Sequence, residues 1–176
     1  VASVGALADD DLLNDLEAAA MEGRAKLILP AGAVPGIDAV NAATIGSLAK
    51  VSYISRKPPA AWAGTPAEAR LANSEEGEAI AFYAGSARAA ARDYPKNANV
   101  AAIIALAGLG FDQTDVQLVA DPTLDANGHE IMAEGSFGRM HLRIEGRPLA
   151  DNPKTSALAA FSVIRSILNR LRTVQI

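Results

Sequence analysis

Imidazole is the side chain best suited to proton transfer near neutral pH, and the chain has two histidines, His129 and His141. His129 follows the tight-turn pair Asn127-Gly128 and opens a predicted strand, whereas His141 lies inside the alternating run MHLRI. The usual role of either residue is structural, as an exposed or hydrogen-bonded side chain. A turn–strand junction, however, holds a side chain rigidly beside a cleft. His129 is therefore the better candidate for a general base.

Three clusters of cationic and hydrogen-bonding side chains are candidates for binding a carboxylate or a phosphate. They are Lys96, Asn97 and Asn99 in the sequence PKNANV, the pair Arg56 and Lys57, and the run Lys154, Thr155 and Ser156. Each cluster also has a simpler explanation. Asn97 would serve as a helix N-cap, the basic pair as solvated charges on an edge strand, and the third run as the cap of the last helix.

Several classes of protein are disfavoured. The chain of 176 residues has no cysteine, and it has no G-x-G-x-x-G, G-x-x-x-x-G-K-[ST] or H-E-x-x-H motif, so we predict no metal site. The net charge of -4 gives no basic face for nucleic acid. Apolar runs are too short to predict a membrane-spanning helix. The absence of cysteine fits a reducing compartment, and we expect a cytoplasmic protein.

The first part of the chain is predicted to be the end of a Rossmann-type parallel sheet. The apolar runs at residues 1–7 and 25–32 are expected to be strands, and residues 10–22 a helix with Asp9 as N-cap and Gly23 at its end. Ligands bind beyond the carboxyl ends of such strands. The sequence PAGA, which contains Ala33, would then lie at a cofactor-binding edge. The chain is expected to enter its first strand part-way.

The remainder predicts an α+β domain built on an open mixed sheet. Alternating strands are expected around residues 51–57, 79–86, 115–121 and 129–146, with helices around a break at Pro95 and a long helix at the end. The predicted boundaries are 1–40 for the end of the Rossmann domain, 41–155 for the catalytic and dimerisation domain, and 156–176 for the closing helix. A hydrophobic sheet face left open would make a homodimer.

Longer blocks of sequence resemble the L-aspartate dehydrogenase family. They include LPAGAVPGIDAV, SRKPPAAWAGTPAE, the stretch around PKNANVAAIIALAG, HEIMAEGSFG and RIEGRPLADNPKTSALAAF. The match covers almost the whole chain and corresponds to the C-terminal portion of the family, with most of the N-terminal Rossmann domain absent. The resemblance implies that His129 is the catalytic histidine and that Ala33 and Asn99 contact the cofactor.

The resemblance further implies an NAD- or NADP-dependent oxidation of L-aspartate to iminoaspartate, which hydrolyses to oxaloacetate and ammonia, in NAD biosynthesis or aspartate catabolism. Lys57, Lys96 and the run 154–156 would bind the two substrate carboxylates. Fold alone does not choose this activity. A related oxidoreductase of the dihydrodipicolinate reductase or homoserine dehydrogenase type, or a non-catalytic binding fragment, remains an alternative.

Overall fold

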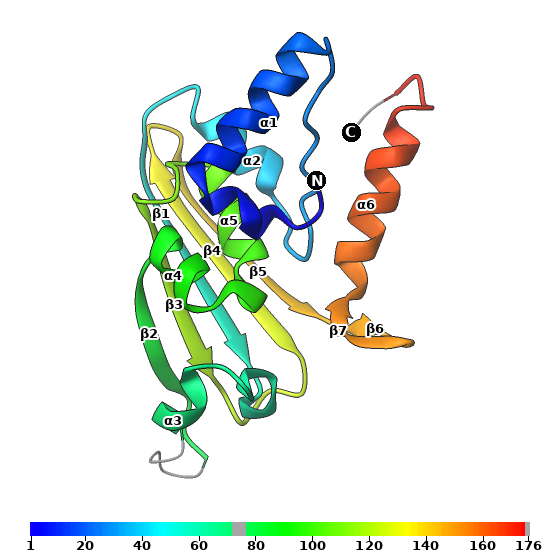
Figure 1. Cartoon of the computed structure of the whole chain (residues 1–176). Coiled ribbons are helices and arrows are strands. Elements are labelled where there is room, and N and C mark those ends of the chain that lie inside the picture. Colours follow the sequence, from blue (N-terminus) through cyan, green and yellow to red (C-terminus); the bar gives the residue numbers. More distant parts are fainter. Residues whose placement is uncertain (72–76, 175–176) are drawn as a thin grey trace.

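A five-stranded mixed sheet forms the centre of the protein (Figure 1). The computed structural model describes residues 1–71 and 77–174, except for the side chains of residues 96, 153 and 154. The strands are β1 (Leu48–Lys57), β2 (Ile80–Ser86), β3 (Thr114–Ala120), β4 (Asn127–Gly135) and β5 (Gly138–Gly146), in the order β2-β3-β1-β4-β5. β1 runs parallel to β3, and the other neighbours are antiparallel. The predicted α/β class with an open mixed sheet is confirmed.

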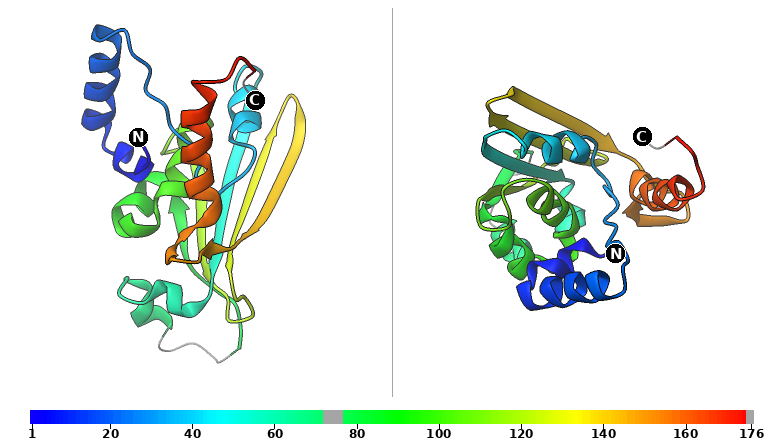
Figure 2. Two further views of the ribbon diagram at one scale, coloured as in Figure 1. Left: turned by 90° about the vertical axis from the view of Figure 1, so that its right-hand side faces the viewer. Right: turned by 90° about the horizontal axis from the view of Figure 1, so that it is seen from above.

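Helices cover one face of this sheet (Figure 2). They are α2 (Ile37–Ala43), α4 (Ala87–Asp93) and α5 (Asn99–Ala107), and α5 packs on β1 and β3 between the other two. α5 is apolar on all sides and six of its nine residues are buried, as expected of a helix inside a core. In β1, Val51, Tyr53 and Ser55 point toward the helices, so the predicted alternation of this strand is confirmed.

The opposite face of the sheet is polar, so the expected open hydrophobic face is wrong. Alternation along β4 and β5 places their charged positions on this side. Glu130 accepts a hydrogen bond from Arg56 at 3.0 Å, and Arg143 donates to Glu145 at 2.8 Å. Charged positions so close together keep this face solvated.

The two strands expected near the start of the chain are also wrong. Residues 4–8 form the 3-10 helix η1 (Val4–Ala8), and the dozen residues after α1 (Asp10–Glu22) pair with no described strand. A short apolar run cannot be distinguished from a buried helical turn by its pattern alone. Val4 and Leu7, three positions apart, are buried on the side of η1 that meets α5. The cap is as predicted, because Asp9 accepts from two backbone N–H groups of the first turn.

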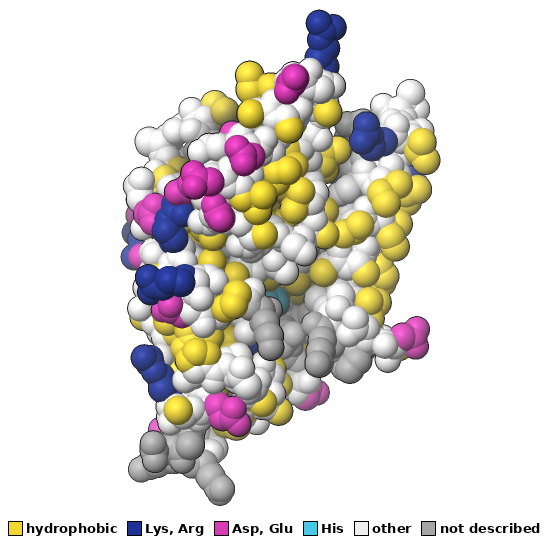
Figure 3. Space-filling view, in the orientation of Figure 1, with side chains coloured by type: hydrophobic (Ala, Val, Ile, Leu, Met, Phe, Trp, Pro, Cys, Tyr) yellow, Lys and Arg dark blue, Asp and Glu magenta, His cyan; other side chains and the backbone are white. Residues whose placement is uncertain are grey.

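The end of the chain forms an arm, which we define as residues 148–169. It consists of β6 (Pro148–Leu149), β7 (Asn152–Ser156) and the predicted long helix α6 (Ala157–Asn169). Figures 1 and 2 show α6 beside the rest of the molecule, and Figure 3 shows a stripe of hydrophobic side chains along it. A hydrogen bond from Gly32 N to Ser162 Oγ at 3.0 Å ties the helix to the chain before α2.

Short helical segments complete the fold. Two predicted helices are indeed interrupted at Pro95, where the 3-10 helix η3 (Pro95–Asn97) separates α4 from α5. The 3-10 helix η2 (Pro59–Trp62) and α3 (Ala67–Leu71) follow β1. Among the described residues no helix has the length and apolar character needed to cross a bilayer.

Candidate active site

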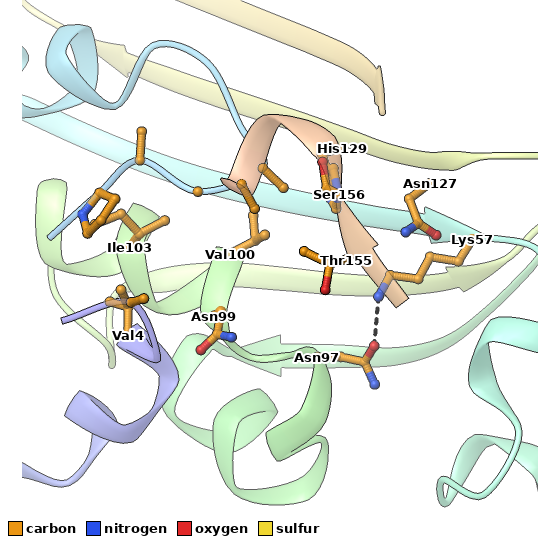
Figure 4. A pocket seen from close by; sticks show the side chains of 16 residues that line it. Val4, Lys57, Asn97, Asn99, Val100, Ile103, Asn127, His129, Thr155 and Ser156 are labelled. Carbon is orange, nitrogen blue, oxygen red and sulfur yellow. Dashed lines mark hydrogen bonds between the residues drawn. The ribbon is translucent and has the colours of Figure 1, made fainter. Parts of the chain in front are cut away.

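One pocket brings together most of the residues singled out from the sequence (Figure 4). It lies where β1 ends and β4 begins, between the start of α5, the turn before α2 and the junction of β7 with α6. Its lining includes six predicted site residues: Ala33, Lys57, Asn99, His129, Thr155 and Ser156. The pocket therefore combines segments that lie far apart in the sequence.

His129 is held at the inner wall of this pocket by the pairing of two strands. The register of β1 with β4 sets it opposite Ser55. Only 4% of His129 is exposed, and its Nδ1 lies 2.8 Å from the hydroxyl oxygen of Tyr53. Burial, and to a lesser extent the positive charge of Lys57, lowers the pKa of His129 to about 4. At neutral pH the imidazole is therefore uncharged. Because Nδ1 is engaged with Tyr53, Nε2 is the ring nitrogen that remains for a ligand.

Lys57 supplies a cation at the end of β1. Its Nζ donates to Asn97 Oδ1 at 2.7 Å (Figure 4). The same Nζ lies 5.0 Å from the centre of the Trp62 ring. Burial lowers the pKa of Lys57 to about 8, so the ammonium form still predominates at pH 7. The alternative of a solvated edge charge is wrong, because β1 is a central strand and Lys57 faces the pocket. A partly buried ammonium can bind a carboxylate strongly.

Asn99 and Ala33 form the other side of the pocket. Asn99 Oδ1 accepts a hydrogen bond from Gly5 N at 2.8 Å, so the amide nitrogen is the group that Asn99 offers to the pocket. A side chain at position 5 would place its Cβ only 3.0 Å from that oxygen. Glycine has no Cβ, so η1 can lie this close to Asn99. Ala33 is buried and follows Gly32, whose φ of +73° forms the turn. A small side chain here leaves room for a flat ligand.

The start of α6 contributes hydrogen-bonding groups. Thr155 and Ser156 line the pocket, and Ser156 is the N-cap residue of α6 but makes no side-chain capping bond. Its Oγ is buried and has no hydrogen-bond partner among the described residues. A buried hydroxyl without a partner is costly, so this oxygen is available for a ligand. The side chains of Lys96 and Lys154 lie outside the described residues.

Three residues of the site were not predicted for their actual roles. Tyr53 bonds to His129, Asn97 accepts from Lys57 rather than capping α5, and Asn127 lines the pocket. Tyr53 lies two positions before Ser55 on the buried face of β1, and Asn127 lies two positions before His129 on the same face of β4. The missing information was the register between β1 and β4. His141, as expected, is the weaker candidate: it is exposed on the polar face, 3.4 Å from Glu130.

Carboxylates and imidazoles do not cluster in this region, and the described residues contain no group of acidic, histidine or cysteine side chains that could hold a metal ion. The fold and the pocket define an α/β protein with a candidate small-molecule site at one end of a mixed sheet. Residues 38–170 match the family described as "Aspartate dehydrogenase, C-terminal". The chain belongs to that family, and the resemblance found in the sequence is confirmed.

Comparison with individual relatives supports the same family. The chain is similar to L-aspartate dehydrogenase of Ralstonia pickettii (strain 12J), with 51% identity over 176 residues, and to that of Pseudomonas aeruginosa, with 49% identity over 176 residues. Both matches cover 100% of this chain and 66% of the relative, so the chain spans just under two thirds of their length. A crystal structure of aspartate dehydrogenase from Thermotoga maritima superposes with a TM-score of 0.78 at 25% identity, and the match covers 98% of this chain and 65% of that one.

Proposed function

We propose that the protein to which this chain belongs oxidises L-aspartate to iminoaspartate with NAD or NADP, and that His129 is the general acid and base. The observation that carries the proposal is the single pocket in which a neutral, buried imidazole faces an ammonium group, an amide and an orphan hydroxyl. The names of the relatives, L-aspartate dehydrogenase, support the choice of substrate.

The wall formed by Ala33 and Asn99 fits a nicotinamide cofactor. Ala33 is small enough to let a flat ring approach, and the amide nitrogen of Asn99 is a donor for a carboxamide oxygen. When bound, the cofactor would supply the hydride acceptor. We further propose that residues 1–40 belong to the end of a Rossmann domain.

His129 would handle the proton of the substrate amine. The bound α-ammonium gives one proton to Nε2 of His129, and the free amine then assists departure of the α-hydrogen as hydride, which leaves an iminium carbon–nitrogen bond. After His129 has released this proton to solvent, it accepts a proton from the water that attacks that carbon, and it returns the proton to the departing amine as the adduct collapses to oxaloacetate and ammonia. A general base of this kind contributes roughly 10²–10⁴ in rate.

Both substrate carboxylates need partners. Lys57 is proposed to bind one, through the ammonium group that Asn97 already orients. The start of α6 is proposed to bind the other, through Thr155, the orphan hydroxyl of Ser156 and the positive end of the helix dipole. Lys96 and Lys154 remain proposed contributors from the same two segments.

We also propose a cytoplasmic homodimer with a role in NAD biosynthesis or aspartate catabolism. The polar sheet face does not support dimerisation, but the apolar stripe on α6 does, because Phe161, Ile164 and Ile167 are more than half exposed. Light scattering on the complete protein at micromolar concentration should show a dimer. A monomer there would overturn this part of the proposal.

The activity is tested by aspartate-dependent reduction of NAD and NADP, followed through the absorbance of the reduced nicotinamide. The proposal predicts turnover with L-aspartate and little or none with homoserine, which lacks the second carboxylate. Turnover with homoserine but not aspartate would contradict it and favour the alternative oxidoreductase class. Turnover with neither substrate would favour a binding role.

A further inference from the structure

The hydrogen bond between Tyr53 and His129 lies behind the pocket rather than in it. Tyr53 Oη and His129 Nδ1 are 2.8 Å apart, and only 1% of Tyr53 is exposed. Tyr53 is absent from the residues that line the pocket, whereas His129 is among them. Any effect of this phenol on a ligand must therefore pass through the imidazole.

This hydrogen bond can be made in two ways, with opposite consequences for the pocket. A neutral imidazole has one N–H donor and one acceptor nitrogen. If the Tyr53 hydroxyl donates to Nδ1, His129 carries its hydrogen on Nε2 and offers the pocket a donor. If Nδ1–H donates to Tyr53 Oη, Nε2 offers a lone pair and can accept a proton.

Ser55 is a second possible acceptor for the hydroxyl hydrogen of Tyr53. It is two residues from Tyr53 on the same face of β1, is paired with His129 across the sheet and is 2% exposed. Ser55 lies within hydrogen-bonding reach of the Tyr53 hydroxyl, and burial raises the Tyr53 pKa far above its ordinary value. The phenol therefore keeps its proton, and Ser55 and His129 are the two neighbours that can accept it.

We propose that Tyr53, with Ser55 as its second partner, is a positioning residue that sets the tautomer of His129. When Tyr53 donates to Ser55, its oxygen accepts from Nδ1–H, and Nε2 is the base that the aspartate reaction needs. Once Nε2 has taken a proton, the same oxygen still accepts from Nδ1–H and stabilises the imidazolium. The catalytic consequence rests on the proposed function, whereas the tautomer is a property of the free protein.

Tyr53→Phe tests the kinetic consequence, because it removes the hydroxyl and keeps the ring. Nδ1 would then be buried without an acceptor, which disfavours a hydrogen on it and leaves Nε2 protonated. With aspartate as substrate, kcat should fall by roughly 10- to 1,000-fold with little change in KM, as expected when a catalytic imidazole is held in the wrong tautomer. The matched control is Tyr83→Phe, which removes a hydroxyl that donates to Ser86 O at 3.2 Å on β2. That variant should keep the parent kcat.

Nitrogen-15 NMR of the histidine side chains in the complete, ligand-free protein tests the tautomer itself. The hydrogen of His129 should move from Nδ1 to Nε2 in Tyr53→Phe. It should move the same way in Ser55→Ala, where the Tyr53 hydroxyl can donate only to Nδ1. The second variant keeps the test decisive if Tyr53→Phe fails to fold.

The outcomes separate this inference from the proposed function. An unchanged His129 tautomer in the folded variants overturns the positioning role, even if aspartate is oxidised. A shifted tautomer in a protein that does not oxidise aspartate overturns the proposed function and leaves the positioning role intact.

Discussion

The sheet layer and the arm at residues 148–169 differ in how they hold their side chains. In the sheet layer Tyr53 and Ile131 are each 1% exposed, and Ile104 of the overlying helix is fully buried. In the arm the exposed fractions of Phe161 and Ile164 are 57% and 53%. The candidate pocket lies where the two regions meet, with His129 contributed by the sheet and Ser156 by the arm.

This difference separates two parts of the chemistry. The group proposed to move protons belongs to the sheet, where strand pairing and close packing fix its position in advance. The groups proposed to hold one substrate carboxylate belong to a helix with few packing partners among the described residues. Segments of that kind open at low free-energy cost. We therefore expect loss of the sheet's imidazole to affect turnover, loss of buried side chains of the sheet layer to affect stability, and substitutions in the arm to affect ligand binding.

The largest effect should come from His129→Ala. Removal of the general base should lower kcat for aspartate oxidation by roughly 10²–10⁴. The control is His141→Ala, which removes the other histidine from the exposed polar face and should leave kcat close to that of the parent. Steady-state kinetics of both variants check this. Equal losses of kcat in the two variants would contradict the assignment of general-base catalysis to the buried imidazole.

A second comparison concerns stability. Ile104→Ala in α5 creates a cavity in the core and should lower the free energy of unfolding by about 2–5 kcal/mol. Ile164→Ala in α6 deletes the same atoms from a side chain that is 53% exposed in the single chain, and should change the free energy of unfolding by less than about 0.5 kcal/mol at protein concentrations low enough to dissociate the proposed dimer. Denaturant titrations of the two variants measure both values. A larger loss for Ile164→Ala would show that the arm is packed as tightly as the sheet layer.

Acidification should also reveal the buried imidazole. The pKa of His129 is lowered to about 4 in the folded state, against an ordinary value of 6.5, so between these pH values the unfolded chain binds a proton that the folded chain does not. This difference in proton binding contributes up to about 3 kcal/mol to the free energy of unfolding. The contribution is fully present above pH 6.5 and is lost as the pH falls toward 4. His129→Gln should flatten that part of the unfolding profile, and His141→Gln should not. If His129→Gln and His141→Gln changed the unfolding profile in the same way, the attribution of this pH dependence to His129 would be contradicted.

The smallest effect expected is that of Lys57→Met. Loss of a charged hydrogen bond to a substrate carboxylate costs about 1.5–3 kcal/mol and should lower kcat/KM for aspartate roughly 10- to 100-fold, mainly through KM. Lys50→Met, on the exposed polar side of the same strand, is the matched control and should have no effect. A loss confined to kcat would instead point to a role for Lys57 in the chemical step.

Much of the sheet region could be predicted from the sequence, and the residues explain why. The alternation around Tyr53 and the Pro95 break depend on local rules that the structure obeys. The tight turn predicted at Asn127-Gly128 is wrong, because both residues are already paired in β4. The strands predicted at residues 1–7 and 25–32 are wrong, because a short apolar stretch does not specify whether it pairs with a strand or packs as a helical turn. The register that brings Tyr53 to His129 also escaped prediction, because it depends on the pairing of strands about 75 residues apart in the chain.

The most direct test of the account is the position of His129 in a crystal structure of the complete protein with reduced nicotinamide cofactor and L-aspartate, a pair that cannot react. The account predicts that Nε2 lies about 2.6–3.2 Å from the α-nitrogen of aspartate, or one water molecule away from it. An α-nitrogen held by other groups, with the imidazole out of its reach, would contradict it.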